Sequence, residues 1–125
     1  MTAKVLYIED NPDNMQLVQQ VIESCGYDFA WASDGLSGLT QAERWHPDLI
    51  LLDINLPDMD GYEVARRLRS SGSGLHATPI IAVTANALRG DADRALEAGC
   101  DVYMSKPIVV RELMARIMAF LPDAA

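Results

Sequence analysis

Carboxylates follow two apolar stretches of this chain, at the point where each stretch ends. Glu9 and Asp10 end the stretch KVLYIED, and Asp53 ends the unbroken apolar run at residues 49–52. Such runs, bounded by turn residues, are typical of strands buried on both faces of a parallel sheet. Ligands of open parallel sheets bind beyond the carboxyl ends of the strands, so we expect these acids to share one rim. Asp53 taken alone is equally well explained as an ordinary turn residue.

Two further polar side chains follow later apolar stretches. Thr84 ends residues 79–84, and Lys106, one of only two lysines, comes soon after residues 101–104. Taken singly, Thr84 is explained as an ordinary strand end and Lys106 as a solvated lysine.

Together these residues indicate a particular chemistry. Three carboxylates crowded at one rim repel each other, and a divalent cation together with a lysine offsets that repulsion. Ligands that are all oxygen suit Mg²⁺. The rim therefore predicts a site for Mg²⁺ and a phosphoryl group, which an aspartate accepts and whose oxygens Thr84 and Lys106 hold.

The elements that must position these residues alternate regularly between strand and helix. Expected strands cover residues 4–10, 27–32, 48–53, 79–84 and 101–104. The first helix is expected to open at Asn11 and Pro12 and to stop at Gly26; the second follows residues 33–35 and is limited by Pro47. The third opens with a D-x-x-E capping pattern, Asp60 and Glu63; the fourth covers residues 88–98 and the fifth reaches about residue 121.

This alternation predicts an α/β fold: a doubly wound, five-stranded parallel sheet with helices on both faces, forming one domain over residues 1–125. Tyr27, Phe29 and Trp31 alternate with smaller or polar residues, which favours an edge position for their strand. Other details are less regular. Residues 70–78 are expected to form a loop, and Arg69 to lie on the outer and C-terminal part of the third helix. The fifth helix is expected to lack a polar cap at Val109 and Val110. Trp31, Trp45 and the methionines of the fifth helix are expected to pack.

Composition excludes several classes of protein. The formal charge of −8 argues against nucleic-acid binding, which depends on lysine and arginine contacts to phosphates. No apolar run approaches the ~20 residues of a membrane span, and the N-terminal stretch is too short and polar-broken for a signal peptide. Cys25 and Cys100 have no metal-ligand spacing, so we expect both to pack as small apolar residues in a reducing cytoplasm.

The ordered set of site residues resembles the receiver domain of two-component response regulators. The resemblance rests on Glu9-Asp10, Asp53 in LLDINLPDMDG, Thr84-Ala85, Tyr103 and Lys106-Pro107, and it covers essentially the whole chain. It implies the flavodoxin-like fold of CheY, with strand order 2-1-3-4-5. Asn11 and Asn14 in EDNPDN further resemble receivers of the DivK type and those of hybrid kinases.

The resemblance also implies a ligand set. Asp53 would be the phosphoacceptor, attacking a phosphohistidine of a histidine kinase or a histidine phosphotransfer protein. Asp10, Asp53 and the backbone carbonyl of Asn55 would bind Mg²⁺ directly, and Glu9 would bind it through water.

A switch is implied as well. Lys106 would pair with Asp53 and then with its phosphate, and Thr84 would move to hydrogen-bond the phosphate. Tyr103 would turn inward with it, and the Lys106-Pro107 bond would be cis.

Signalling is expected to run through protein contacts, because the chain ends soon after the fifth helix. The expected surface is the face of the fourth helix, fifth strand and fifth helix, where an adaptor or kinase would bind. Its candidate positions are Ala87, Leu88, Arg94, Asp101, Val102 and Arg111. Beyond its own phosphotransfer and slow self-dephosphorylation we expect no enzyme activity.

Several alternatives remain at this point. The chain could be a receiver module of a hybrid histidine kinase, and a phosphorelay shuttle cannot be separated from an allosteric adaptor. An aspartyl-phosphate phosphatase of the haloacid dehalogenase type needs a second aspartate where this chain has Asn55. A flavodoxin-like flavin carrier needs a Ser/Thr/Gly-rich loop where this chain has Glu9 to Pro12, which would repel phosphate without a metal.

Overall fold

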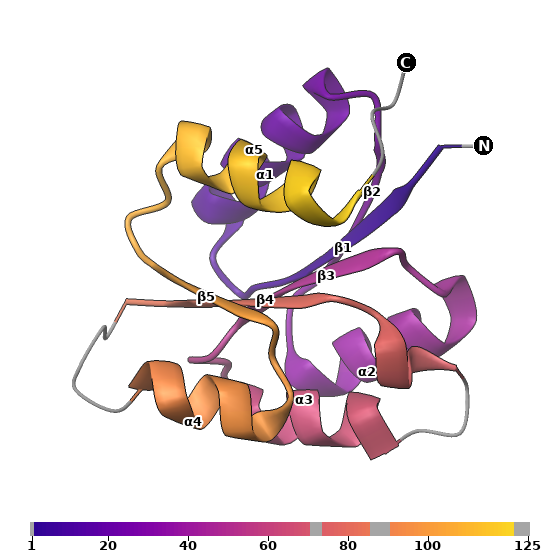
Figure 1. The fold of residues 1–125 in the computed structure, drawn as a ribbon, viewed down its shortest axis with the longest axis vertical. Coiled ribbons are helices and arrows are strands. Elements are labelled where there is room, and N and C mark those ends of the chain that lie inside the picture. The colour runs from indigo at the N-terminus through magenta and orange to yellow at the C-terminus, as the bar shows by residue number, and fades with distance from the viewer. Residues whose placement is uncertain (1, 71–73, 86–90, 122–125) are drawn as a thin grey trace.

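The computed structural model describes residues 2–70, 74–85 and 91–121. They form a parallel sheet of five strands in the order β2-β1-β3-β4-β5, so the predicted architecture and strand order are confirmed. The strands are β1 (Lys4–Ile8), β2 (Asp28–Ala32), β3 (Leu49–Asp53), β4 (Ile80–Thr84) and β5 (Val102–Ser105). The helices are α1 (Pro12–Ser24), α2 (Gly35–Trp45), α3 (Gly61–Ser70), α4 (Asp91–Ala98) and α5 (Val110–Phe120). Helices α1 and α5 cover one face of the sheet, and α2, α3 and α4 cover the other (Figure 1).

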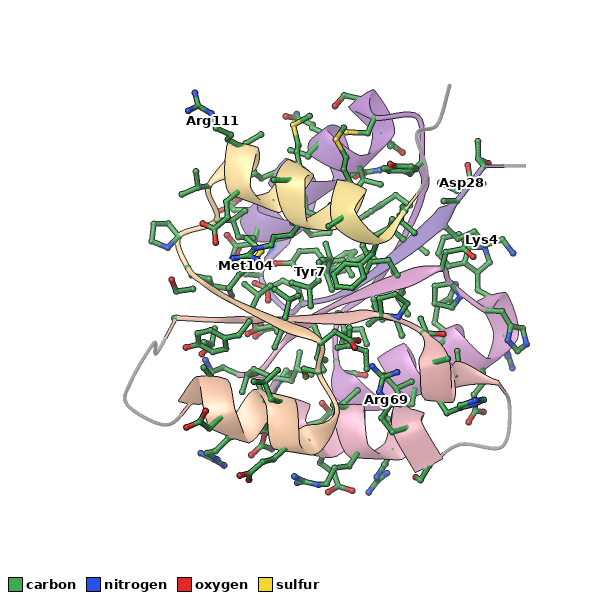
Figure 2. All side chains as sticks on the ribbon, in the orientation of Figure 1. Lys4, Tyr7, Asp28, Arg69, Met104 and Arg111 are labelled. Atoms are coloured by element: carbon green, nitrogen blue, oxygen red, sulfur yellow. The ribbon has the colours of Figure 1, made fainter. Side chains whose placement is uncertain are left out.

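Each face of the sheet carries its own hydrophobic core, as the unbroken apolar runs require. Every residue of β3 and β4 is buried. Tyr7 and Met104 belong to the core on the α5 side of the sheet, where Figure 2 labels them. Because β1 and β3 pair in parallel with Ile8 opposite Leu52, the next residues, Glu9 and Asp53, reach the rim side by side. The register of two buried strands thus brings the acids together.

Helix α1 begins as the sequence indicates. The Asn11 side chain accepts hydrogen bonds from the backbone N–H groups of Asp13 and Asn14, and Pro12 occupies the first turn. Val109 occupies the N-cap position of α5 and provides no side-chain cap, also as predicted.

Helix α3 begins differently from the prediction. The Asp60 carboxylate accepts the backbone N–H of Tyr62 at 2.8 Å, which is half of the expected capping pattern. Glu63 does not complete it, because its carboxylate pairs instead with Arg66 and Arg67 one turn further along the helix. Arg66 and Arg67, at the favoured i+3 and i+4 spacings, compete more strongly for the Glu63 carboxylate than the single backbone N–H of the expected cap does.

Other boundaries shift slightly. Within the stretch expected to be a loop, α3 extends to Ser70 and residues Leu75–Ala77 form a short 3₁₀ helix. The predicted start of the fourth helix lies outside the described residues, and α4 is seen from Asp91. Among the helices described, none has the length and apolar character that crossing a membrane requires.

Arg69 lies in the last turn of α3, as expected, but not on an outer surface, so that part of the expectation was wrong. Its side chain runs between α3 and β4 (Figure 2), where it donates to Asp101 at 2.8 Å and to several backbone carbonyls. These carbonyls are Gly99 at 2.8 Å, Leu75 and His76 at 3.2 Å, and Thr78 at 2.6 Å. Asp101 in turn accepts the backbone N–H of Ile80 at 2.9 Å. Arg69 therefore joins two connections, α3–β4 and α4–β5, at the rim opposite the acids.

We predict that Arg69→Met lowers the free energy of unfolding by about 3 kcal/mol, because it leaves Asp101 and partly buried carbonyls without their donor. Arg67→Met is the matched control, since Arg67 lies on the same helix, is half exposed and pairs with Glu63. This control should cost less than about 1 kcal/mol. Urea denaturation measures both values, and equal losses would contradict the role given to Arg69.

Candidate functional site

The predicted acids do meet at the carboxyl rim of the sheet. Glu9, Asp10 and Asp53 each place one carboxylate oxygen so that the three atoms lie within 4.8 Å of one another. Glu9 and Asp53 are 0% and 1% exposed, whereas Asp10 is exposed. The cluster thus combines two fixed, buried carboxylates with one that faces solvent.

Lys106 lies against this cluster, as predicted. Its ammonium nitrogen is 3.3 Å from the Asp53 carboxylate, and closer still to Glu9, at 2.9 and 3.2 Å from its two oxygens. The backbone N–H of Lys106 donates to the carbonyl of Thr84 at 2.7 Å, which ties the end of β5 to the end of β4. The expected cis bond between Lys106 and Pro107 is present.

Thr84 and Asn55 complete the surroundings of Asp53. The backbone N–H of Asn55 donates to one Asp53 oxygen at 3.0 Å. The Asn55 side-chain amide lies 3.4 Å from the hydroxyl of Thr84, which is itself buried. Tyr103 is half-buried and lies opposite Ala82 of β4, on the sheet face to which Thr84 also belongs. The threonine and tyrosine of the expected switch therefore lie on the same face of adjoining strands.

The loop that follows Asp53 is fixed by two turn residues. Gly61 donates its N–H to the carbonyl of Ile54 at 2.9 Å, and a Cβ on Gly61 would lie 2.7 Å from the carbonyl oxygen of Asp53. Only glycine allows so close an approach. Asp58 accepts the N–H groups of Gly35 and Leu36 at the start of α2, at 2.7 and 2.9 Å. The loop after Asp53 is thereby attached to a helix N-terminus, where a negative charge is favourable.

Two contacts to Glu9 were missed by sequence reasoning. The side-chain amide of Asn14 donates to Glu9 at 2.8 Å, although the sequence indicated Asn14 only through a family resemblance. The indole N–H of Trp31 donates to the Glu9 backbone carbonyl, so packing alone does not describe this side chain. Trp31 is 38% exposed at the sheet edge, and a polar partner for its N–H is the usual requirement of a partly buried indole.

The surroundings shift the pKa values of the two buried carboxylates in opposite directions. Burial, followed by the hydrogen bond with Glu9, raises the pKa of Asp53 to about 7. Burial also opposes ionisation of Glu9, but hydrogen bonds from Asp53, Asn14 and Lys106 outweigh it and lower the Glu9 pKa. Burial disfavours the charged form of Lys106 too, yet the two carboxylates raise its pKa. Excess negative charge and oxygen-only donors are what a hard divalent cation such as Mg²⁺ requires.

Comparison with known proteins decides between the families considered. The family model described as "Response regulator receiver domain" matches residues 5–118 of the chain. The chain belongs to this family. The phosphatase and flavin-carrier alternatives are thereby set aside, and the receiver is a component of a two-component phosphorelay.

Relatives and solved structures agree with this assignment. The polar-differentiation response regulators DivK of Brucella ovis and Brucella suis are 44% identical to this chain, over 99% of this chain and all of theirs. The receiver domain of sensor histidine kinase PA1611 from Pseudomonas aeruginosa, described with a magnesium ion coordinated in its active site cleft, is 37% identical with a TM-score of 0.87. The structural match covers 96% of this chain and 98% of the PA1611 chain. CheY4 of Vibrio cholerae is 26% identical with a TM-score of 0.90, covering 97% of this chain and all of that one.

The raised Asp53 pKa predicts a pH dependence of stability in the absence of divalent cations. Folded Asp53 binds its proton up to about pH 7, whereas the unfolded chain releases it near 3.8. The stability that this proton contributes is complete below the lower value and is lost as the pH rises through the higher one. In EDTA the urea midpoint of the parent should therefore fall between pH 5 and 8 more steeply than that of Asp53→Asn.

The control for this comparison is Asp13→Asn, which removes an exposed carboxylate from the first turn of α1. It should keep the slope of the parent. Parallel slopes for the parent and Asp53→Asn would show that Asp53 does not retain a proton near neutrality.

Proposed function

We propose that this receiver takes a phosphoryl group onto Asp53 from the phosphohistidine of a histidine kinase or a histidine phosphotransfer protein, with Mg²⁺ at the acid cluster. The observation that supports the proposal best is the convergence of Glu9, Asp10 and Lys106 on one buried carboxylate. The Asn55 N–H holds one oxygen of Asp53 and Lys106 lies against the other, so the carboxylate is oriented before a donor arrives. Positioning of this kind supplies most of the catalysis in phosphoryl transfer.

Asp10, Asp53 and the backbone carbonyl of Asn55 are the proposed direct ligands of Mg²⁺, with Glu9 acting through water. The oxygen-only cluster fits this ion, and the related PA1611 receiver is described with magnesium in its active site cleft. When bound, Mg²⁺ neutralises negative charge on the carboxylates and on the incoming phosphoryl oxygens.

The transfer step itself uses the chain's own residues. An Asp53 oxygen forms a bond to phosphorus as the phosphorus–nitrogen bond of the donor breaks, and the electron pair returns to the imidazole. Lys106 then pairs with a phosphoryl oxygen, and the Thr84 hydroxyl donates to another. Beyond this transfer and a slow hydrolysis of the acyl phosphate by water, no enzyme activity is assigned.

The output is proposed to pass to a separate adaptor or kinase on the face of α4, β5 and α5. Ala87 and Leu88, two candidate positions there, lie outside the described residues. Arg94 and Arg111 are exposed, and Val102 is half-buried. The Asp101 carboxylate is held by Arg69, which makes it a poorer contact for a partner. Phosphate adds charge at the rim, and displacement of Thr84 would let Tyr103 move on the adjoining strand.

The acceptor is tested by intact-mass spectrometry after incubation with acetyl phosphate and Mg²⁺. The parent should gain one phosphoryl group, and both Asp53→Asn and addition of EDTA should abolish the gain. Asp58→Asn is the matched control, because Asp58 lies on the same loop and the amide oxygen of its replacement can still accept a backbone N–H at the start of α2. Undiminished modification of Asp53→Asn would refute the assignment.

Asp10→Asn should weaken Mg²⁺ binding about tenfold or more.

The switch is tested by two-dimensional NMR of amide signals before and after phosphorylation. In the parent, signals of β5 around Tyr103 should shift, since the two states differ in structure there. Thr84→Ala should still gain a phosphoryl group, as measured by mass spectrometry. It should lose most of these NMR shifts, because it lacks the hydroxyl that hydrogen-bonds the phosphoryl group. Thr84→Ser keeps the hydroxyl and should behave like the parent. Parent-sized shifts in Thr84→Ala would contradict the proposed role.

A further inference from the structure

Asn14 connects helix α1 to the acid cluster. Its backbone N–H donates to the Asn11 side chain at 3.1 Å, which fixes the residue in the first turn of the helix. Its side-chain amide then reaches Glu9 at 2.8 Å. Asparagine has no intrinsic advantage at this place, where a glutamate or glutamine would complete a capping box. The contact with Glu9 accounts for the residue type.

Glu9 receives more than one donor. Its Oε1 atom accepts both the Asn14 amide and the Lys106 ammonium, at 2.8 and 2.9 Å. Its Oε2 atom accepts Lys106 at 3.2 Å. Asp53 competes for the same ammonium at 3.3 Å. Lys106 is therefore shared between two buried carboxylates, and it lies nearer to Glu9 than to the acceptor.

We propose that Asn14 is a positioning residue: its amide competes with Lys106 for the Glu9 carboxylate and so keeps the ammonium within reach of Asp53. A neutral donor on Oε1 satisfies part of the hydrogen-bonding capacity of Glu9. Without it, the buried Glu9 carboxylate turns towards Lys106, the charged donor that remains, and draws it away from the acceptor. This inference rests on the proposed function of Asp53.

The chain offers a direct readout, because Lys4 and Lys106 are its only lysines. Lysine-selective ¹³C and ¹⁵N labelling gives two sets of side-chain signals, and Lys4→Arg assigns them. Lys4 contacts the carbonyl of Trp45 and so serves as an internal reference away from the acids. In EDTA, Asp53→Asn should shift the Lys106 signal of the parent. In an Asn14→Leu background the same substitution should produce less than half of that shift, since Lys106 has moved to Glu9.

A kinetic measurement complements the spectra. Asn14→Leu keeps the shape of the side chain and removes its donor, and it should slow phosphorylation by acetyl phosphate about fivefold at saturating Mg²⁺, as expected for one lost hydrogen bond. Asn14→Gln keeps the amide and should recover at least half of the rate. Gln16→Leu is the matched control, because it removes an exposed amide from the same helix and should leave the rate unchanged.

The outcomes separate this inference from the proposed function. If the parent gains no phosphate on Asp53, the proposed function fails, and the lysine signals in EDTA still test Asn14. If the parent is phosphorylated while Asn14→Leu matches it in rate and in Lys106 shift, the inference is overturned. Should Asn14→Leu fail to fold by circular dichroism, Asn14→Ser takes its place, and unchanged Lys106 signals there would overturn the inference equally.

Discussion

One lysine shared between two buried carboxylates is the interaction on which this structure depends. Glu9 and Asp53 are held side by side by strand register and are almost without solvent. Their repulsion is offset by the ammonium of Lys106, which arrives from a different strand end. Burial of like charges is costly unless a counter-charge and hydrogen bonds accompany it. The strands, the connection after β5 and the loop after Asp53 all serve to bring these compensating groups together.

The two rims of the sheet differ in how well their charged side chains are compensated. At the carboxyl rim three carboxylates lie around one lysine, so their negative charge is incompletely balanced. At the opposite rim Arg69 and Asp101 are engaged with backbone groups of the α3–β4 connection, the start of β4 and the α4–β5 connection. Concentrating such contacts away from the reactive rim lets the acid cluster carry unfavourable charge without loss of the fold.

The side chains around Glu9 show how far sequence patterns reach. Apolar runs predicted β1 and β3, and the acids that end them predicted the cluster, because parallel strands place successive ends on one rim. The contacts of Asn14 and Trp31 with Glu9 were not predicted, since they depend on how α1 and β2 pack beside β1. Arg69 was placed on the surface because helical periodicity says nothing of carbonyls that a neighbouring turn presents.

The sequence by itself determined the alternation of strands and helices, the edge position of β2, the membership of the acid cluster and the family resemblance. These follow from local periodicity and from residues that adjoin strand ends, which are properties of short segments. Only the tertiary structure decided that Lys106 lies closer to Glu9 than to Asp53, that Asn14 shares the same oxygen and that Glu63 leaves its expected cap. Each of these is a competition between partners; for Glu9 and Lys106 the distances differ by tenths of an ångström, and packing in three dimensions sets them.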